Sequence, residues 1–341
     1  MKNYIYLALS ALAVCACAKA PSTGANEDAK LYFESWMQVH HPEAVRTKLG
    51  AYVLDEVPGT GAAFAEEKDG VYVRVDYVTT SLDGTITGTT LESVSQQLGS
   101  YQFGNYYGPV LWYCGEGSLA AGIEEALGTM RVGGSKTFVL PGWLQTLSRY
   151  DSAEAYEENV SGGSPAIYEI RLQEIVRDIV QWETDSIAGY IPRSFPGKEA
   201  ADSLEYGFYY FRTGEPSSDE KFPADTTIYI NYIGRLLNGT VFDTNVKDSA
   251  KFYGIYSASR SYEPSSITFS TEGEGEDAET TAQMGSSSVI PGFSKVLTQM
   301  HPHEKGSGVF YSTFGYGSSG SGASIPAYSP LRFDIEIVDK P

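Results

Sequence analysis

Apolar and aromatic residues recur in the last third of the chain at positions that could form one hollow. They occur as a Phe-Asp pair, a Val-Ile-Pro-Gly-Phe run, a Tyr-Gly turn and an Ile-Pro run, between two alternating segments. An apolar hollow can hold a proline ring and favour rotation about the preceding peptide bond. Amide resonance creates the barrier to that rotation. The twisted amide is less polar than the planar one, so an apolar site favours it without a covalent intermediate.

Strands, turns and one short helix must position these residues. The segments 228–232 and 331–337 alternate apolar and polar residues, as strands with one buried face do. Asn238-Gly239 has the residue types of a two-residue hairpin turn. The segment 292–300 carries apolar residues at helical spacing. We therefore expect an antiparallel sheet packed on a short helix.

The same order of elements occurs once before in the chain. Segments 71–77, 83–84, 122–130 and 167–172 match the later ones in alternation, turn residues and helical spacing. Two copies at this long period indicate duplicated domains rather than a solenoid. The predicted fold class is α+β, with two domains at 45–177 and 201–341, each an antiparallel sheet wrapped around a short helix.

Three further segments complete the predicted organisation. Residues 18–44 are read as a tether followed by a helix over 28–38. Its broad apolar face would consist of Leu31, Tyr32, Phe33, Trp36 and Met37. Residues 178–200 are read as a connecting helix to Tyr190 and a linker in which Pro192 and Pro196 break regular structure.

The first 17 residues have the features of a targeting segment. Lys2 is followed by a short apolar run that ends in Val14-Cys15-Ala16-Cys17. This run is too short to cross a bilayer as a helix. It resembles a bacterial lipoprotein signal in which Cys17 would carry the lipid; a plain secretory signal is the alternative. The lipid would anchor the protein in the bacterial cell envelope, at the outer membrane, facing either the periplasm or the exterior.

Charge and cysteine content narrow the possible functions. The formal net charge of −19 argues against nucleic-acid binding and against adhesion of the protein body to an anionic membrane. Contact with a membrane is expected through the N-terminal lipid only. Cys114 is the one cysteine after the signal, and we expect it to be structural. The oligomeric state stays open.

Several other motifs have a chemical and a structural interpretation. The acidic run 272–279 has carboxylates that suit calcium, but a solvated loop explains them better. His301-Pro-His303-Glu304 could be part of a metal site, but exposed histidines after a helix are more common. Trp112 and Trp143 could bind peptides, but large aromatic residues in a sheet usually belong to a core. No metal site and no cofactor are predicted.

The second copy, over residues 202–341, resembles the FKBP-type peptidyl-prolyl cis-trans isomerases in the order of its motifs. The resemblance implies activity on proline-containing polypeptide clients. It implies catalytic roles for three residues, with Phe293 as the pocket floor, Tyr316 as a hydroxyl donor to the substrate carbonyl, and Asp243 beside them. The remaining pocket residues that it implies are Tyr232, Phe242, Val289, Ile290, Ile325 and Phe333.

The chain departs from the family pattern in two ways. Insertions at 244–266 and 270–288 should lie at the pocket rim, where they could gate, select or block substrate. In the first copy, Thr87-Gly88 replaces the Phe-Asp pair and Ile123 replaces the aromatic floor, so we expect its pocket to be lost. A non-catalytic peptide-binding or chaperone lipoprotein, or an envelope interaction protein, is therefore the alternative to an isomerase.

Overall fold

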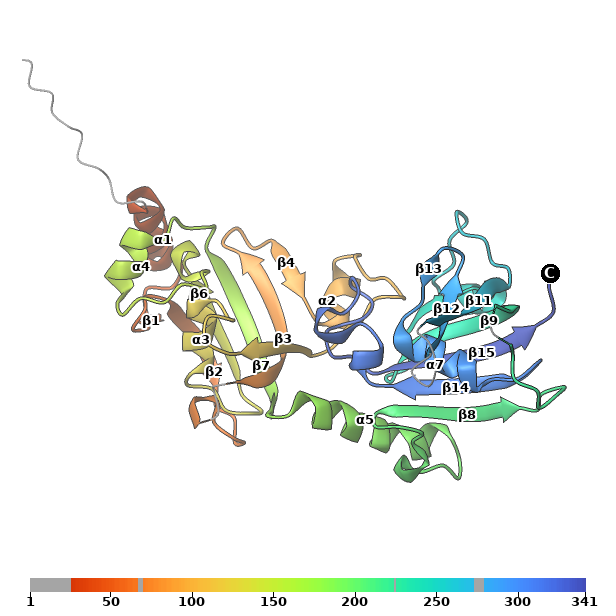
Figure 1. Ribbon diagram of the computed structural model, residues 1–341. Helices are drawn as coiled ribbons and strands as arrows, with labels where there is room; N and C mark the ends of the chain where they lie inside the picture. The colour runs from red at the N-terminus through yellow and green to blue at the C-terminus, as the bar shows by residue number, and fades with distance from the viewer. Residues whose placement is uncertain (1–25, 67–69, 224, 273–278) are drawn as a thin grey trace, which may run out of the picture.

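The computed structural model of the chain describes residues 26–66, 70–223, 225–272 and 279–341. Within these residues, two antiparallel sheets lie side by side and are joined by one long helix (Figure 1). Each sheet packs on a short helix, so the predicted α+β class is confirmed. The signal segment with Cys17 and the first part of the tether lie outside the described residues.

The first sheet has the strand order β1-β2-β6-β7-β3-β4, with β5 also paired to β3. Its strands are β1 (Val45–Arg46), β2 (Tyr52–Val57), β3 (Val71–Ser81), β4 (Ile86–Thr89), β5 (Val110–Cys114), β6 (Ser135–Leu140) and β7 (Ala166–Val176). Its helices are α1 (Glu27–His40), α2 (Glu92–Gln97), α3 (Ala121–Leu127) and α4 (Ala153–Asn159).

The apolar face of α3 packs into the core of the first domain. Ile123 and Leu127 of this helix, and Met130 just after it, are buried as their spacing predicts. Helix α1 joins the same core through Phe33 and Met37. The predicted apolar face of α1 was too broad: Leu31 is 67% and Tyr32 58% exposed, because they lie on the side that no other described element covers.

The second sheet has the order β13-β12-β11-β9-β15-β14-β8, with β10 also paired to β9. Its strands are β8 (Phe208–Gly214), β9 (Thr227–Leu236), β10 (Val241–Thr244), β11 (Ser265–Glu272), β12 (Glu279–Met284), β13 (Ser287–Ser288), β14 (Lys305–Phe310) and β15 (Leu331–Val338). Its helices are α6 (Lys247–Phe252) and α7 (Pro291–Gln299).

Helix α7 places its apolar residues on the inner face of the second sheet. Phe293 and Leu297 are buried, as is Met300 directly after the helix. The turn between β9 and β10 contains Gly239 at φ +97°, a backbone conformation that glycine adopts without strain. The insertion 270–288 is largely the β11–β12 hairpin and β13, so it extends the sheet rather than forming an irregular loop.

The connecting helix α5 (Ile179–Ser194) is longer than predicted and contains Pro192 in its last turn. A proline there removes one hydrogen bond of a helix that ends two residues later, which is why the helix tolerates it. Helix α5 packs Ile187 and Ile191 against Tyr209 and Val309 of the second sheet. Glu183 accepts hydrogen bonds from Ser312 N (2.6 Å) and Oγ (2.7 Å). The helix thus belongs to the outer layer of the second domain (Figure 1).

Candidate active site

A cavity of about 660 Å³ opens on the second domain between β9, β10, α7 and the segment before β15. The structure brings all nine residues of the expected pocket to its wall. They are Tyr232, Phe242, Asp243, Val289, Ile290, Phe293, Tyr316, Ile325 and Phe333. Five further lining residues had not been anticipated from the sequence: Met284, Ser288, Ser321, Gly322 and Ser324.

Aromatic rings packed edge to face form the inner end of the cavity. The Phe293 ring lies 4.9 Å from Phe333 at 82° and 5.7 Å from Tyr232 at 83°. Phe242 meets Phe333 at 5.7 Å and 78°. Such T-shaped pairs are favourable beyond the area that they bury. They hold the ring surfaces in a fixed shape, so the cavity exists before any ligand enters it.

Gly234 on β9 makes room for two of these rings. A Cβ atom at this position would lie 2.7 Å from the Phe242 ring and 2.8 Å from the Phe333 ring. No side chain fits there without moving them. Alternation alone would place an ordinary strand residue at this position, so the sequence did not show its importance.

Helix α7 begins at the cavity and orients Phe293, the residue expected to form the cavity floor. Pro291 occupies the first helical turn, where its missing N–H and fixed φ are compatible with a helix start. Gly292 follows, and a Cβ there would lie 2.4 Å from the Phe310 ring. The close approach of α7 to β14 lets Phe293 reach the cavity, while Val289 and Ile290 form a wall directly before the helix.

Three polar side chains form a network at the mouth of the cavity. The Tyr232 hydroxyl donates to Asp243 Oδ2 at 2.6 Å. Arg260 forms an ion pair with Asp243 Oδ1, and its Nη2 donates to the Tyr232 hydroxyl at 3.2 Å. Burial and the neighbouring Asp243 carboxylate raise the pKa of Tyr232. This phenol therefore remains a donor at neutral pH, and the Asp243 carboxylate is already occupied by two partners.

Arg260 was missed because it lies in the insertion 244–266. The insertion has no regular apolar spacing after α6, and the sequence does not show that it turns back to Asp243. Two residues at its start hold it to β9: the Asn245 Oδ1 accepts from Tyr232 N at 2.8 Å, and Thr244 Oγ1 donates to Tyr232 O at 2.6 Å. Both are buried. The insertion therefore supports the Tyr232 backbone and supplies the cation of the network.

Tyr316 lies across the mouth from this network, on the segment that precedes β15. Its side chain is 36% exposed, and its hydroxyl has no hydrogen-bond partner among the described residues. Burial, with a smaller effect of Asp243, raises the pKa of this phenol. A protonated hydroxyl without a partner can donate a hydrogen bond to a ligand carbonyl, as the family resemblance predicts for this residue.

The corresponding region of the first domain is built differently. Tyr77 takes the place of Tyr232, and its ring lies 5.5 Å from Trp112. Trp112 on β5 pairs with Val73 on β3, as Ile267 pairs with Ile228 in the second domain. A large indole thus occupies the neighbourhood where the second domain carries an isoleucine. Trp143 is a buried core residue, as expected.

The remaining candidate sites do not gather ligand groups. Among the described residues, no group of three His, Cys, Asp or Glu could hold a metal ion. His303 is exposed, as expected, whereas His301 is half-buried and its Nδ1 lies 2.8 Å from Oε2 of the buried Glu304. Cys114 is buried, and burial raises the pKa of its thiol to about 12, as expected for a structural cysteine. Most of the acidic run 272–279 lies outside the described residues.

Comparisons with known proteins point to one family. Residues 218–338 match the family model of the FKBP-type peptidyl-prolyl cis-trans isomerases. A short-type peptidyl-prolyl cis-trans isomerase of Methanocaldococcus jannaschii is 38% identical over 74 residues, 22% of this chain and 46% of that protein. The FKBP-type 22 kDa isomerase of Escherichia coli is 30% identical over 145 residues, 42% of this chain and 54% of that protein. The chain thus spans about half the length of these relatives.

A solved structure shows a weaker similarity. It is a peptidyl-prolyl cis-trans isomerase of Pseudomonas syringae pv. tomato, which is 22% identical to this chain. The match covers 47% of this chain and 92% of that one, with a TM-score of 0.31.

Proposed function

Because the C-terminal region of this chain belongs to the FKBP-type peptidyl-prolyl cis-trans isomerase family, we propose that its cavity rotates X–Pro bonds in polypeptides. The observation that carries this proposal is the meeting of all nine expected residues around one open cavity. Its volume of about 660 Å³ lies in the usual range of ligand sites. The described residues of the rim insertions leave the cavity unfilled, which favours catalysis over a blocked pocket.

The mechanism follows from the chemistry of the wall. The planar amide is stabilised by resonance and carries the larger dipole, whereas the twisted amide is closer to a ketone beside an amine. The apolar rings around Phe293 accept the proline and solvate the planar form poorly, so the barrier falls. Tyr316 would donate a hydrogen bond to the carbonyl before the proline and hold it while the C–N bond turns. No covalent bond forms or breaks during this rotation.

Asp243 has a positioning role in this mechanism rather than an acid–base role. Its carboxylate is bound by Tyr232 and Arg260, so it fixes the Tyr232 ring that forms one side of the cavity. Isomerisation transfers no proton, so the mechanism does not need the Asp243 carboxylate to be free to accept one.

A measurement of X–Pro exchange by the full chain tests this proposal. The rate of cis-trans exchange in a short Leu-Pro peptide is followed by NMR with and without the protein. Tyr316→Phe is the matched variant, because it removes one hydroxyl that has no structural partner among the described residues. A folded protein that leaves the exchange at its spontaneous rate would disprove the proposal.

We further propose that lipid on Cys17 anchors the protein in the bacterial envelope. The support is the sequence of the first 17 residues. Among the described residues, no helix has both the length and the apolar character needed to cross a bilayer. Labelling of cells with a palmitate analogue should mark the parent protein and leave a Cys17→Ser variant unmarked. Equal labelling of both would contradict the proposal.

Binding of unfolded polypeptide without catalysis is the second candidate function. It is favoured by aromatic side chains exposed near the junction of the domains, Phe252 at 82% and Phe103 at 61%. If this function holds, replacing both with serine should weaken the suppression of aggregation of a denatured protein. In that case the parent protein should also leave the cis-trans exchange of a short Leu-Pro peptide at its spontaneous rate.

A further inference from the structure

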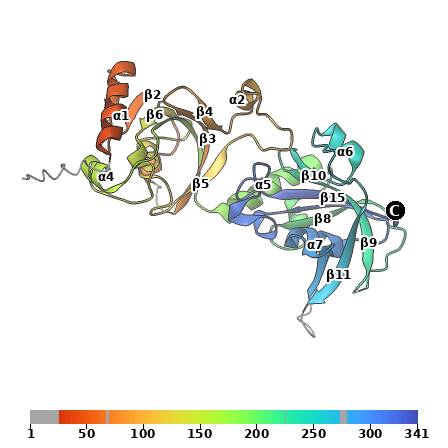
Figure 2. The ribbon, with the colours of Figure 1, turned by 90° about the horizontal axis from the view of Figure 1, so that it is seen from above.

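The first domain reaches the cavity of the second domain through the loop 100–109, between α2 and β5. Figure 2 shows α2 on the side of the first sheet that faces the second domain. Phe103 lies on Gly254, where an added Cβ would be 2.6 Å from its ring. A Cβ added at Gly104 would be 3.1 Å from Ile255. The loop thus packs against the rim insertion that also carries Arg260.

The same loop contacts the opposite rim of the cavity. Tyr106 N donates a 2.9 Å hydrogen bond to the Ala323 carbonyl, at the tip of the segment that precedes β15. The neighbours of Ala323, Gly322 and Ser324, both line the cavity. The Tyr106 ring packs against the hydrophobic core of the second domain, although the residue belongs to the first. Its hydroxyl donates back to Pro109 O at 3.0 Å, which keeps the loop in shape.

A second contact holds the base of this rim segment. Tyr72 on β3 and Tyr328 have hydroxyl oxygens 3.0 Å apart and ring centroids 5.0 Å apart at 76°. Tyr328 adopts φ +56°, which is unusual for a residue with a side chain. Its N–H donates to Gly317 O at 2.8 Å, one residue after Tyr316. The first domain therefore contacts the segment at its tip and at Tyr328, whose N–H is bonded to the residue after Tyr316.

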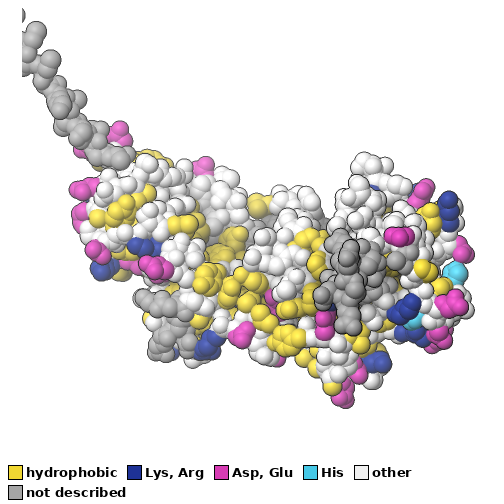
Figure 3. All heavy atoms as spheres, viewed as in Figure 1, with side chains coloured by type: hydrophobic (Ala, Val, Ile, Leu, Met, Phe, Trp, Pro, Cys, Tyr) yellow, Lys and Arg dark blue, Asp and Glu magenta, His cyan; other side chains and the backbone are white. Residues whose placement is uncertain are grey.

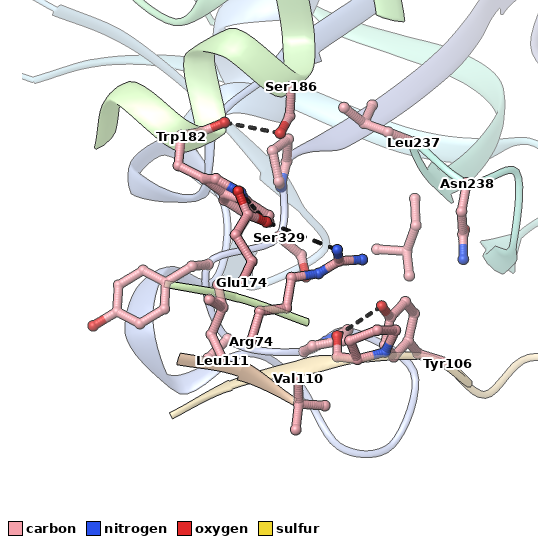
Figure 4. Close-up of a pocket in the computed structure, with 16 residues that line it drawn as sticks. Arg74, Tyr106, Val110, Leu111, Glu174, Trp182, Ser186, Leu237, Asn238 and Ser329 are labelled. Carbon is pink, nitrogen blue, oxygen red and sulfur yellow. Dashed lines mark hydrogen bonds and ion pairs between the residues drawn. The ribbon is translucent and has the colours of Figure 1, made fainter. Parts of the chain in front are cut away.

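Between these two contacts, the described residues leave a hollow beside Pro326 and Ala327. A cavity of about 380 Å³ separates the segment from the first domain, lined by residues of both domains and of α5 (Figure 4). Arg74, Val110 and Glu174 of the first sheet lie on one side and Trp182 of α5 on another (Figure 4). Because this cavity lies between them, the Tyr106 and Tyr72 contacts are separate points of support on this side. Hydrophobic side chains also gather in the middle of the face shown in Figure 3.

We infer that the first domain positions the binding cavity of the second, with Tyr106 and Tyr72 as positioning residues for the segment 316–328. The inference rests on the proposed function. The segment carries Tyr316 and Ile325, and its internal support includes the short bridge Ser321–Ile325. Without the outer supports it samples other arrangements. The apparent affinity for substrate then falls by the fraction of time that the segment is in place.

Tyr106→Ala in the full chain tests this inference, with Tyr106→Phe as the conservative control. Alanine keeps the backbone N–H that binds Ala323 O but removes the ring that packs on the second domain, whereas phenylalanine keeps the ring and loses the hydroxyl that binds Pro109 O. We expect Tyr106→Ala to raise KM for a Leu-Pro peptide about three- to tenfold, with kcat within about twofold of the parent. Tyr106→Phe should keep both constants near those of the parent. A partly unfolded protein would instead lose kcat and keep KM.

Amide hydrogen exchange supplies the readout that does not depend on activity. In Tyr106→Ala, the amides of 321–325 should exchange faster than in the parent, while those of β14 stay protected. Tyr72→Phe, which removes one hydroxyl and is expected to fold, should accelerate exchange at Tyr328. A parent without isomerase activity would refute the proposed function, and exchange alone would then decide the positioning role. Unchanged exchange in both variants, or an unchanged KM in an active Tyr106→Ala variant, would overturn the inference.

Discussion

The Tyr232 hydroxyl donates a 2.6 Å hydrogen bond to Asp243 Oδ2, across the hairpin that joins β9 and β10. Arg260 contacts both side chains from the insertion that begins at the last residue of β10. An aromatic wall of the cavity is thereby fixed by a charged network at its rim. The strength of that network can be tested separately from the stability of the fold.

Arg260→Ala should lower kcat/KM for isomerisation while changing the free energy of unfolding only slightly. The Arg260 and Asp243 side chains are 41% and 34% exposed, so their ion pair contributes about 1 kcal/mol or less to the free energy of unfolding. The Tyr232 ring would lose one of its supports, and we expect a several-fold fall in kcat/KM. Lys251→Ala is the matched control, because Lys251 lies in the same insertion over the Tyr256 ring. An equal effect of both substitutions would contradict the role of Arg260.

Tyr316→Phe should lower kcat with little change in the free energy of unfolding. Its hydroxyl has no hydrogen-bond partner among the described residues, so the fold loses no bond. One hydrogen bond to the substrate carbonyl contributes about 0.5–1.5 kcal/mol, which corresponds to roughly two- to twelvefold in rate. NMR exchange rates at saturating and limiting peptide separate kcat from KM. An unchanged kcat would show that the hydroxyl does not act in the rate-limiting rotation.

Phe293→Ala should be costly to both stability and binding. The side chain is 3% exposed and contacts the Tyr232 and Phe333 rings. Removal of a buried phenylalanine costs about 3–5 kcal/mol when the surroundings do not collapse. Urea unfolding measures this loss, and Phe293→Leu should recover a large part of it. A cost below about 1 kcal/mol would mean that Phe293 is not a packed floor.

Gly234→Ala and Gly189→Ala should change stability in opposite directions. At Gly234 the new methyl would meet the Phe242 and Phe333 rings at 2.7 and 2.8 Å, and overpacking costs about 1–3 kcal/mol. At Gly189, within α5, the nearest neighbour is Arg193 Nη2 at 3.9 Å. Alanine there should stabilise the helix by about 0.4–1 kcal/mol. Thermal unfolding should show a lower melting temperature for Gly234→Ala and a higher one for Gly189→Ala. A stabilising Gly234→Ala would refute the steric argument.

Glu304→Gln should remove part of the acid sensitivity of the fold. Burial alone would raise the pKa of Glu304, but hydrogen bonds from Tyr210, His301 and Arg212 outweigh it and lower that pKa. A lowered pKa in the folded state stabilises the protein above the ordinary carboxyl pKa, and this stabilisation is lost as pH falls through the lowered value. The variant should therefore be less stable than the parent at pH 7, with a smaller difference near pH 3. Urea unfolding at both pH values tests this, and a difference that grows in acid would contradict it.

Local patterns in the sequence determined the repeated elements, whereas the set of nine cavity residues was implied by the resemblance to the FKBP-type isomerases. Alternation, Asn-Gly turns and helical spacing depend on neighbours in the chain, and these can be read without a structure. The order of the motifs then implied that Tyr232, Phe293 and Phe333 face one hollow, and the structure brings them together. Their catalytic roles stay predictions until rates are measured.

Contacts between distant segments were decided only by the tertiary structure. The pairing of Arg260 with Asp243, the space that Gly234 leaves for two rings, and the hydrogen bond from Tyr106 to Ala323 join residues with no common local pattern. The exposure of Leu31 and Tyr32 was misjudged for the same reason, since a helix does not show which side its neighbours cover. Periodicity reports the face that a residue takes on its own element. Which residues pack against that face depends on contacts between segments that are far apart in the sequence.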